Sequence, residues 1–388
     1  MSSKIIGLDY RPALVNGEGI GRATRELVRA LVELTGDETD HVNLELFGWT
    51  LAASKFNTSE LGLGAGPCVT ANLHRLRIPS RLTKLVLPIL GGADGVLGAS
   101  SPGAIFHHTQ PNRLPIRFAR QTTMLWDAIY LDEKGQPGGP WVELATAMSM
   151  SESARKAAKD SDLILTPTDF VRNDLIQKLG LAPSKVVTVG LGCDHLPQPD
   201  LSVFHTRPPF VLTVCRVDPR KNHIAMLRAF ERIVNENLPH HWIVAGPEGW
   251  RSDEFGRALE NSPAKERVHW LREVPEDELV ELYATCDAFL FASHAEGFGL
   301  PPLEAMHFGR AVVASNTTCL PEVLGDAFVP VEPTSEEAIF EGLFKVLTRP
   351  AFAADLRAKA VKQAAKHTWR EAAKRHLFAW EQSPSVRT

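Results

Sequence analysis

The amino-acid sequence predicts an α/β protein with two doubly wound, Rossmann-like domains that face a cleft. Short runs of β-branched and aliphatic residues alternate with segments of helical period along the whole chain. Such alternation forms parallel sheets covered by helices on both faces. A proline-rich break containing Pro197, Pro199, Pro208 and Pro209 divides the alternation into two series. The length of 388 residues exceeds one ordinary hydrophobic core and suits two domains.

The first series supplies the expected elements of an amino-terminal domain at residues 1–200. We expect its strands at residues 4–9, 43–49, 104–107, 122–126, 162–166 and 186–190. The clearest helix covers 20–34, because its apolar positions 20, 23, 27, 31 and 34 form one stripe. A second helix is expected at 168–179.

The second series predicts a carboxyl-terminal domain at residues 207–366. Its strands are expected at 210–215, 241–245, 268–271, 288–291, 311–315 and 328–331. Its helices are expected at 223–234, 275–286 and 335–347. Residues 351–382 indicate two helices with no strand after them, and 367–388 form a separate terminal segment. In doubly wound folds, ligands bind at the carboxyl ends of the strands, which here border the cleft.

Composition narrows the class of protein. Hydrophobic residues make up 44% and charged residues 23%, as in globular proteins. The start of the sequence has no signal-peptide pattern, and no apolar stretch reaches the roughly 20 residues of a spanning helix. We therefore expect a cytoplasmic protein. The five cysteines are odd in number and lack Cys-x-x-Cys spacing, which argues against a disulfide framework and a structural zinc site.

Charge is distributed unevenly, although the formal net charge is only −4. Between residues 61 and 126, Asp94 is the one acid against seven bases. Such a local basic face indicates an anionic partner. Within 73–90, aliphatic residues are interleaved with four of these bases, namely Arg75, Arg77, Arg81 and Lys84. This pattern suits a lipid-diphosphate acceptor or peripheral contact with the anionic inner face of the plasma membrane. The alternative is an ordinary amphipathic helix packed on the first sheet. We expect no nucleic-acid partner.

A nine-residue motif from Glu296 to Glu304 carries the strongest functional signal. It follows an apolar strand and reads Glu296-Gly297-Phe298-Gly299-Leu300-Pro-Pro-Leu-Glu304. Glycines allow backbone N–H groups to approach a ligand, and the start of the following helix favours a diphosphate there. We expect Glu304, in the first helical turn, to accept hydrogen bonds from ribose hydroxyls, and Glu296 to face the sugar. The alternative is that Glu304 completes a helix cap and Glu296 is solvated.

Two basic residues follow the first strand of the second series. Arg216 at the strand end and Lys221 at the helix start are placed to converge on one phosphate group. Fixed cations at this place stabilise the negative charge that a leaving nucleoside diphosphate gains in the transition state. The alternative is that both are surface residues of a βα loop.

A third candidate is the glycine-rich turn at residues 16–22, which precedes the first long helix. It contains Gly19 and Gly21 but does not fit G-x-G-x-x-G, because position 24 is Thr. A contact with an anion and a simple tight turn both stay open at this point.

At these three places the sequence resembles the retaining glycosyltransferases of family four, which have the GT-B architecture. Glu296 and Glu304 match the Glu-x7-Glu marker, and Arg216 and Lys221 match the phosphate-binding pair of that family. Gly-Ile-Gly-Arg at 19–22 matches the loop that contacts the diphosphate. Further matches are the run that begins at Ala245-Gly246 and the closing residues 367–369. The resemblance covers essentially the whole chain.

The resemblance implies a set of functional expectations. They are a nucleotide-sugar co-substrate, retention of configuration at the anomeric carbon, no metal and no other cofactor. A mannose donor, GDP-mannose, is our expectation, with a UDP-sugar as the alternative. The expected acceptor is a saccharide or lipid-linked saccharide of cell-surface glycan synthesis. The final helix is expected to cross back onto the amino-terminal domain.

One departure from the family pattern concerns catalysis. The family carries a His-Asp pair after a strand of the first domain, whereas this chain has Trp126-Asp127. Asp127 keeps its place for binding acceptor or donor sugar, and His107 or His108 is the candidate imidazole. The pair Asp160 and Asp162 is interpreted as surface residues and not as a metal site.

Two other functions share parts of this pattern. A nucleotide-sugar epimerase of the same architecture binds the donor without an acceptor, but needs acid–base carboxylates and histidines at the cleft. A non-catalytic nucleotide-sugar-binding protein is the second alternative. Retention of Arg216, Lys221, Glu296 and Glu304 together argues against it.

Overall fold

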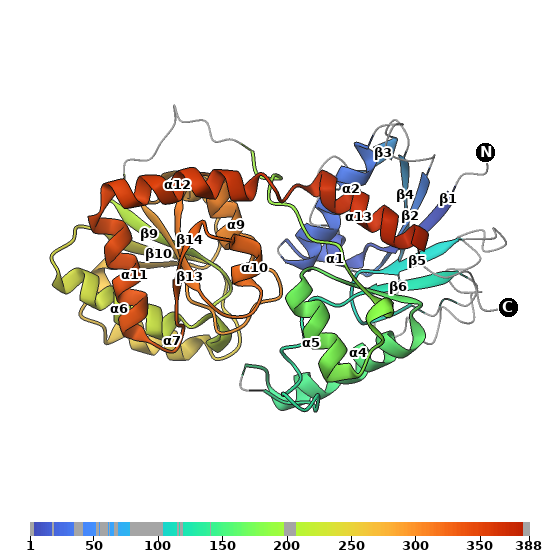
Figure 1. Cartoon of the computed structure of the whole chain (residues 1–388), viewed down its shortest axis with the longest axis horizontal. Coiled ribbons are helices and arrows are strands. Elements are labelled where there is room, and N and C mark those ends of the chain that lie inside the picture. The colour runs from blue at the N-terminus through green and yellow to red at the C-terminus, as the bar shows by residue number, and fades with distance from the viewer. Residues whose placement is uncertain are drawn as a thin grey trace. The chain divides into compact units, whose positions relative to one another are not determined.

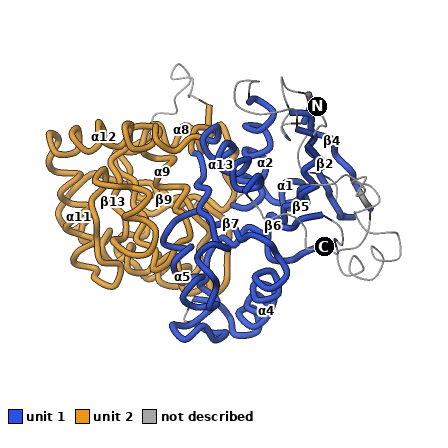
Figure 2. Tube along the Cα trace, turned by 45° about the vertical axis from the view of Figure 1, so that its right-hand side comes forward, with its two compact units in different colours: residues 1–192, 369–388 blue, residues 193–368 orange. Residues whose placement is uncertain are grey.

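The computed structural model divides the chain into two units, which Figure 2 shows in different colours. Unit 1 comprises Met1–Gly192 with Trp369–Thr388, and unit 2 comprises Cys193–Thr368. The structure describes residues 4–17, 19–34, 42–51, 54, 61, 63–65, 69–77, 104–114, 116, 119–139, 141–197 and 207–382. Each unit is an α/β body built on one sheet.

Unit 1 contains an eight-stranded sheet in the order β3-β4-β2-β1-β5-β6-β7-β8. Its strands are β1 Lys4–Asp9, β2 Val42–Trp49, β3 Gly64–Ala65, β4 Val69–Leu76, β5 Ile105–His108, β6 Arg120–Met124, β7 Leu163–Thr166 and β8 Val186–Thr188. All neighbours pair in parallel except β3 and β4, which are antiparallel. Parallel strands need crossover connections, and helices supply several of them.

Unit 1 contains helices from both ends of the chain, and one of them, α5, has clear start and stop signals. They are α1 Arg11–Val15, α2 Ile20–Val32, α4 Leu144–Asp160, α5 Asp169–Leu179 and, from the end of the chain, α13 Trp369–Gln382. In α5, the Thr168 side chain accepts a hydrogen bond from Val171 N, and left-handed Gly180 ends the helix. Such an N-cap and a terminal glycine are standard start and stop signals.

Unit 2 contains a six-stranded parallel sheet in the order β11-β10-β9-β12-β13-β14. Its strands are β9 Phe210–Val214, β10 His241–Ala245, β11 Val268–Leu271, β12 Ala288–Phe291, β13 Ala311–Ser315 and β14 Phe328–Val331. Its helices are α6 His223–Asn235, α7 Ser252–Glu260, α8 Glu276–Thr285, α9 Leu300–His307, α10 Leu320–Leu324, α11 Glu336–Thr348 and α12 Pro350–Ala364. Every residue of β12 and β13 is buried, as expected for strands covered on both faces.

The doubly wound fold predicted from the alternation is confirmed, including parallel sheets in both halves. One strand was not predicted. Residues 73–76, for which an amphipathic helix was the alternative interpretation, continue β4, where Val69 and Ala71 alternate inward and the strand pairs with β2 along its whole length. Pairing with a long neighbour outweighed the apparent helical period. Arg75 on β4 and Arg77 after it are exposed, while Arg81 and Lys84 lie outside the described residues.

The last helix belongs to unit 1, as predicted for a crossing terminal helix. α13 packs against α2, and the two lie side by side in Figures 1 and 2. Its inner face buries Trp369, His376 and Trp380, and Trp380 is fully buried. The apolar face of α13 thus completes the cover over this side of the unit 1 sheet.

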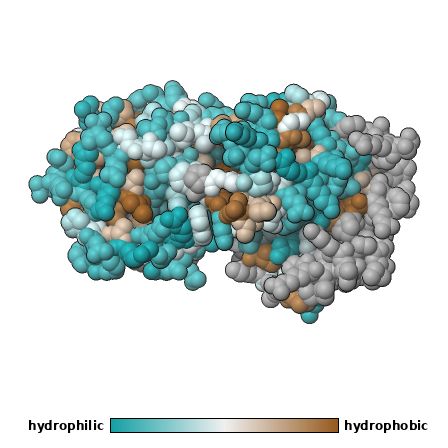
Figure 3. All heavy atoms as spheres, turned by 90° about the horizontal axis from the view of Figure 1, so that it is seen from below, coloured by the Kyte–Doolittle hydropathy of each residue, from teal (hydrophilic) through white to brown (hydrophobic). Residues whose placement is uncertain are grey.

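Apolar side chains on the face shown in Figure 3 form small separate groups among hydrophilic ones. Among the described residues, no helix combines the length and apolar character that crossing a bilayer requires.

We predict that Trp380→Ala destabilises unit 1 by about 3–5 kcal/mol, because it leaves a large cavity under α13. Phe378 on the same helix is 61% exposed, so Phe378→Ala should change the free energy of unfolding by less than about 0.5 kcal/mol. Hydrogen exchange should rise in α2 and α13 of the Trp380 variant and stay unchanged in β9–β14. Equal effects of the two substitutions would contradict this packing.

Candidate functional site

The main candidate site lies at the switch point of the unit 2 sheet. From β9 the chain proceeds through β10 to β11 on one side, then through β12 and β13 to β14 on the other. The connections after β9 and β12 therefore leave in opposite directions and open a crevice at their carboxyl ends. Doubly wound proteins bind ligands in such a crevice.

Glu296 occupies this crevice in the loop after β12. It is only 8% exposed. Its Oε1 lies 2.6 Å from Lys221 Nζ, and its Oε2 lies 3.1 Å from an Arg220 terminal nitrogen. The Glu296 backbone N–H donates to Thr318 Oγ1 at 3.2 Å. Glu296 is therefore a buried, paired carboxylate, and the alternative of a solvated residue is wrong.

Burial acts to raise the pKa of Glu296, but the charges of Lys221 and Arg220 and the hydrogen bonds from Lys221 and Ser293 outweigh it. The net result is a pKa below the usual glutamate value. Glu296 is consequently ionised at neutral pH, and the cluster of one anion and two cations carries a net positive charge.

Lys221 is held in place by the short turn that follows β9. The 3-10 turn Pro219–Lys221 begins at Asp218, whose side chain accepts from Lys221 N at 3.3 Å. Lys221 is 8% exposed, and its Nζ lies 4.9 Å from the centre of the Phe291 ring. Packing and hydrogen bonding together fix this ammonium group, which is the arrangement a preorganised anion site needs.

Asn222 connects three strand ends. It has a left-handed backbone (φ 62°), and its side-chain amide donates to Ala292 O at 2.9 Å and to Pro333 O at 2.8 Å. These carbonyls follow β12 and β14. Asn222 thereby aligns the loops that carry Lys221 and Glu296.

Glu304 lies in the second turn of α9, not in the first as predicted. It is 4% exposed. The Tyr283 hydroxyl donates to its Oε2 at 2.6 Å, and His195 Nε2 lies 3.2 Å from its Oε1. Glu304 is thus held by protein groups from α8 and from the start of unit 2, and it does not serve as a helix cap.

The backbone conformation and close packing at two loops, one of them in the motif, require glycine. Gly299 precedes α9 with φ 84°, and a Cβ there would lie 2.4 Å from Leu320 Cδ2. Gly246, after β10, has φ 153° and would place a Cβ 2.1 Å from the Cys215 carbonyl oxygen. Phe298 is buried against the His367 ring, and Leu300 begins α9. Gly297 connects the buried Glu296 and Phe298.

Arg216 and Lys221 were predicted to converge on one phosphate. Arg216 is exposed and directs one of its terminal nitrogens to Glu248 O at 3.2 Å, and its contact with a phosphate stays a prediction. Arg220 takes the place beside Lys221 on Glu296. Four residues of the site were not predicted from the sequence, namely Arg220, Asn222, Tyr283 and His195. The position of Asn222 directly before a predicted helix is a signal that could have identified it. The contacts of Arg220, Tyr283 and His195 depend on tertiary packing and leave no local pattern.

Unit 1 has its own switch point between β1 and β5. Asp9 ends β1 and is fully buried. Its side chain accepts from Arg11 N at 3.1 Å and from Gln110 Nε2 at 3.3 Å, and Thr109 Oγ1 donates to its backbone oxygen at 2.9 Å. Burial raises the pKa of Asp9 to about 7. Sequence reasoning missed this carboxylate, although an acid ending an apolar strand is a usable signal.

The glycine-rich turn lies beside this crevice at the start of α2. Gly19 precedes the helix with φ 54°, and a Cβ on Gly21 would lie 2.3 Å from Asn16 O. Buried Arg25 donates to Ala13 O and Asn16 O, at 2.9 and 2.7 Å, and thereby fixes the turn from inside. Gly19 is needed for conformation and Gly21 for close packing.

The two residues proposed for catalysis in unit 1 differ in exposure. Asp127 is half-buried after β6, with Oδ1 accepting from Ile129 N at 3.4 Å. His108 is fully buried, and its Nε2 lies 3.2 Å from Gln121 Oε1. Burial lowers the pKa of His108 to about 3. The expectation that His108 meets an acceptor hydroxyl is not met, because the ring has no accessible surface.

The other residues singled out in unit 1 each contact a neighbouring protein group. His107 is buried, with Nδ1 2.8 Å from Thr122 Oγ1, and burial lowers its pKa well below the usual value. Trp126, in place of the family histidine, donates to Thr109 O at 2.8 Å. Asp160 pairs with Arg113 at 3.1 Å and Asp162 accepts from Gln121 N at 2.8 Å. The two aspartates are thus engaged by protein groups at the junction of α4 and β7.

The fold and the ionic cluster define a protein of two Rossmann-like units with the GT-B fold. Residues 199–367 match the family model described as Glycosyl transferases group 1. This match falls within unit 2, and it is this unit that resembles the family.

Curated relatives include bacterial sugar transferases. The chain is 30% identical over 242 residues to O-antigen chain mannosyltransferase B of Escherichia coli, which covers 60% of this chain and 64% of that protein. It is 36% identical over 165 residues to a serotype-specific mannosyltransferase of Escherichia coli, covering 41% of this chain and 20% of that protein. The chain thus spans less than two thirds of either relative.

Solved structures with this fold cover nearly the whole chain. Sucrose-phosphate synthase from Thermosynechococcus elongatus superposes with a TM-score of 0.70 at 16% identity, covering 98% of this chain and 99% of that one. HepE of Anabaena, in complex with UDP and glucose, gives a TM-score of 0.67 at 15% identity, covering 97% and 98%. At this identity the likeness concerns the fold alone.

We predict that Asp9→Asn stabilises the protein increasingly as pH rises. The folded-state pKa of about 7 exceeds the ordinary value of 3.8, so the folded state binds the proton more tightly than the unfolded state. The wild-type protein therefore loses stability from about pH 4 to about pH 7, and the asparagine variant avoids that loss. Melting temperatures of both proteins between pH 4 and 8 check this, with exposed Asp326→Asn as control. A constant difference across this range would contradict it.

We predict that Asn222→Ala destabilises unit 2 by about 2–5 kcal/mol, because two buried carbonyls lose their donor. Asn222→Gly should be less damaging by about 1 kcal/mol, since glycine relieves the left-handed backbone penalty. Asn222→Asp should be the worst, because it places an acceptor against two acceptors. Urea unfolding measures the series, and a different order would show that Asn222 does not hold these loops.

Proposed function

We propose that the chain transfers a hexose from a nucleotide-sugar donor to a saccharide or lipid-linked saccharide, with retention at the anomeric carbon. The observation that carries this proposal is the Lys221–Glu296–Arg220 cluster at the switch point of unit 2. Lys221 and Glu296 are buried and Arg220 is partly exposed, and the cluster has a net positive charge and lies in the unit that matches the family model.

The cluster suits a departing nucleoside diphosphate. An ammonium group has three N–H donors, and Lys221 uses one on Glu296. The remaining donors are available for phosphate oxygens, without a metal ion. Breaking the glycosidic bond moves negative charge onto the diphosphate, so a cation fixed beforehand favours the transition state over the ground state.

Retention is proposed to follow same-face attack. The acceptor oxygen forms its bond to the anomeric carbon as the bond from that carbon to the phosphate oxygen breaks. The acceptor proton passes to the departing phosphate. Ionised Glu296 contributes as a hydrogen-bond acceptor for sugar hydroxyls, while Lys221 and Arg220 keep its carboxylate oriented. In this scheme no histidine is required, which agrees with the inaccessible His108.

Glu304 is proposed to bind the ribose of the nucleotide. Each of its carboxylate oxygens offers two lone pairs. Tyr283 and His195 contact one oxygen each. Their contacts fix the carboxylate in one orientation before the nucleotide arrives, which lowers the ordering cost of binding.

GDP-mannose is our proposed donor. Two relatives described above are named mannosyltransferases, and Gly-Ile-Gly-Arg at 19–22 is the turn associated with mannosyltransferase-like members. The proposed acceptor is a surface glycan intermediate, reached by a cytoplasmic enzyme peripheral to the inner face of the membrane. An epimerase that interconverts nucleotide sugars is the second candidate, and the absence of an acceptor requirement would favour it.

The test combines ligand binding with transfer. GDP, UDP and ADP, each with and without its sugar, are added to the wild-type protein and the rise in melting temperature is measured, since a ligand of the folded state stabilises it by mass action. We expect the guanine series to give the largest rise. Lys221→Ala should remove most of that rise and lower transfer roughly 10²-fold, whereas exposed Lys359→Ala should do neither.

Three results would count against the proposal. A lack of stabilisation by every nucleotide would contradict a donor site, and full transfer by the Lys221→Ala variant would contradict its placement. Conversion of a nucleotide sugar into its epimer without any acceptor would favour the epimerase instead. A larger rise in melting temperature with UDP or ADP would change only the proposed base of the donor and would leave the donor site in place.

A further inference from the structure

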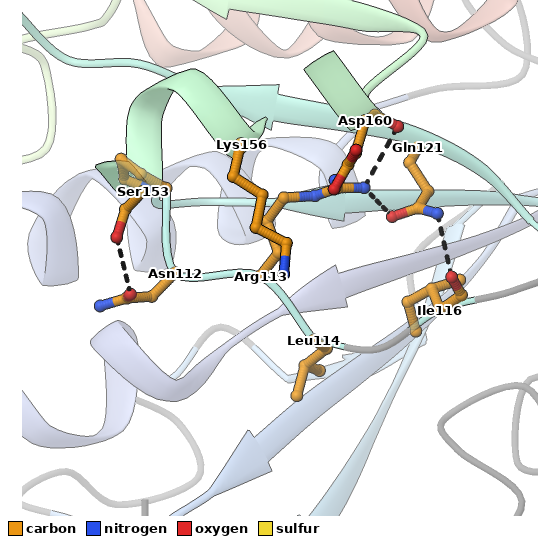
Figure 4. A pocket seen from close by; sticks show the side chains of 9 residues that line it. Asn112, Arg113, Leu114, Ile116, Gln121, Ser153, Lys156 and Asp160 are labelled. Atoms are coloured by element: carbon orange, nitrogen blue, oxygen red, sulfur yellow. Dashed lines mark hydrogen bonds and ion pairs between the residues drawn. The ribbon is translucent and has the colours of Figure 1, made fainter. Parts of the chain in front are cut away.

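A pocket of about 400 Å³ opens on unit 1 between α4 and the loop that joins β5 to β6 (Figure 4). Its lining includes Gln121, at the start of β6, and Asp160, at the end of α4. These residues lie at the amino-terminal edge of β6 and β7. The pocket is therefore separate from the carboxyl-end crevice that contains Asp9 and Asp127.

Arg113 forms the buried side of this pocket. Its side chain is 9% exposed, and one terminal nitrogen lies 3.1 Å from Asp160 Oδ2. The other terminal nitrogen donates to Gln121 Oε1. Its Nε is buried and has no hydrogen-bond partner. Burial lowers the pKa of Arg113, which indicates that its charge is incompletely compensated. A buried N–H donor without an acceptor is costly, so an incoming oxygen would be favourable here.

Lys156 supplies a second cation from α4. In Figure 4 its side chain extends toward the loop of Asn112 and Leu114. Asp160 is four residues further along the helix and would be its usual ion-pair partner, but Asp160 pairs with Arg113 instead. Within the described ranges Lys156 makes no ion pair. Its ammonium group is thus available at the pocket.

Asn112 and Ser153 contribute polar lining on the other side of the pocket. Ser153 Oγ donates to Asn112 Oδ1 at 3.4 Å, and the Asn112 amide nitrogen points away from Lys156 and Arg113 (Figure 4). Leu114 and Ile116 are buried residues of the apolar part of the lining. The pocket therefore combines two cations, one carboxylate that is already paired and an apolar wall.

We propose that this Arg113–Lys156 pocket binds a phosphate group. Lys156 offers a point charge and Arg113 Nε offers a directional N–H donor, and both suit phosphate oxygens. Arg113 belongs to the segment 61–126, where bases greatly outnumber acids. The volume lies in the range of small-molecule sites, so the pocket takes a phosphate with part of the group that carries it. A membrane lipid headgroup and a soluble phosphate compound both have this chemistry.

Hydrogen exchange localises the test, because the proposed donor site in unit 2 also attracts phosphates. Pyrophosphate is titrated into the full-length protein, and protection is followed in peptides from 109–116 and 150–160. The same peptides are followed with vesicles of phosphatidylcholine alone and with added phosphatidylglycerol. Lys156→Ala should weaken the protecting interaction at least about tenfold. Lys159→Ala, an exposed lysine of α4 outside the pocket lining, should leave it unchanged.

Each outcome decides between sources or overturns the proposal. Lys156-dependent protection by pyrophosphate identifies a soluble phosphate compound as the ligand class. Lys156-dependent protection by the phosphatidylglycerol vesicles, without an effect of pyrophosphate, identifies a lipid headgroup. If no probe protects these peptides, or the two lysine variants behave alike, Lys156 is a solvated surface residue and the pocket has no anion site.

Discussion

Burial of the Glu296 carboxylate is the constraint on which the organisation of unit 2 depends. A buried carboxylate is unfavourable unless it is paired, and its partner Lys221 lies 75 residues earlier in the chain. The pairing requires β9 and β12 to be neighbours and their following loops to meet. Asn222 ties the loop after β9 to the chain after β12 and β14. Thr318, which follows β13, accepts a hydrogen bond from the Glu296 backbone. One ionic contact thereby links the sheet order to the position of the candidate donor site.

The two units place a carboxylate at the same topological position but in opposite electrostatic surroundings. Glu296 has two cations within ion-pair distance, and its pKa falls. Asp9 has neutral hydrogen-bond donors, and burial raises its pKa to about 7. The cation pair beside Glu296 is the electrostatic setting that the proposed donor role of unit 2 requires.

Much of the fold followed from periodicity, because strands buried on both faces and helices with one apolar stripe leave local patterns. The bounds of β1 and of β10–β14 agree with those predicted. The strand β4 was not predicted, because pairing with the neighbouring β2 decides the conformation there. In the candidate site, local spacing identified Lys221, Glu296 and Glu304. Arg220, Tyr283 and His195 were missed, because their roles depend on contacts between distant segments that no local pattern encodes.

The glycines at 246 and 299 are explained by the fold, without any ligand. Gly299 and Gly246 adopt positive φ values and contact neighbours so closely that a side chain would collide with them. These glycines would be required in any chain that folds this way, whether or not it binds a nucleotide sugar. Lys221 differs from these glycines, because its ammonium group is a fixed charge with N–H donors that a ligand can use. Its buried charge is therefore better evidence for an anionic ligand than the glycine spacing is.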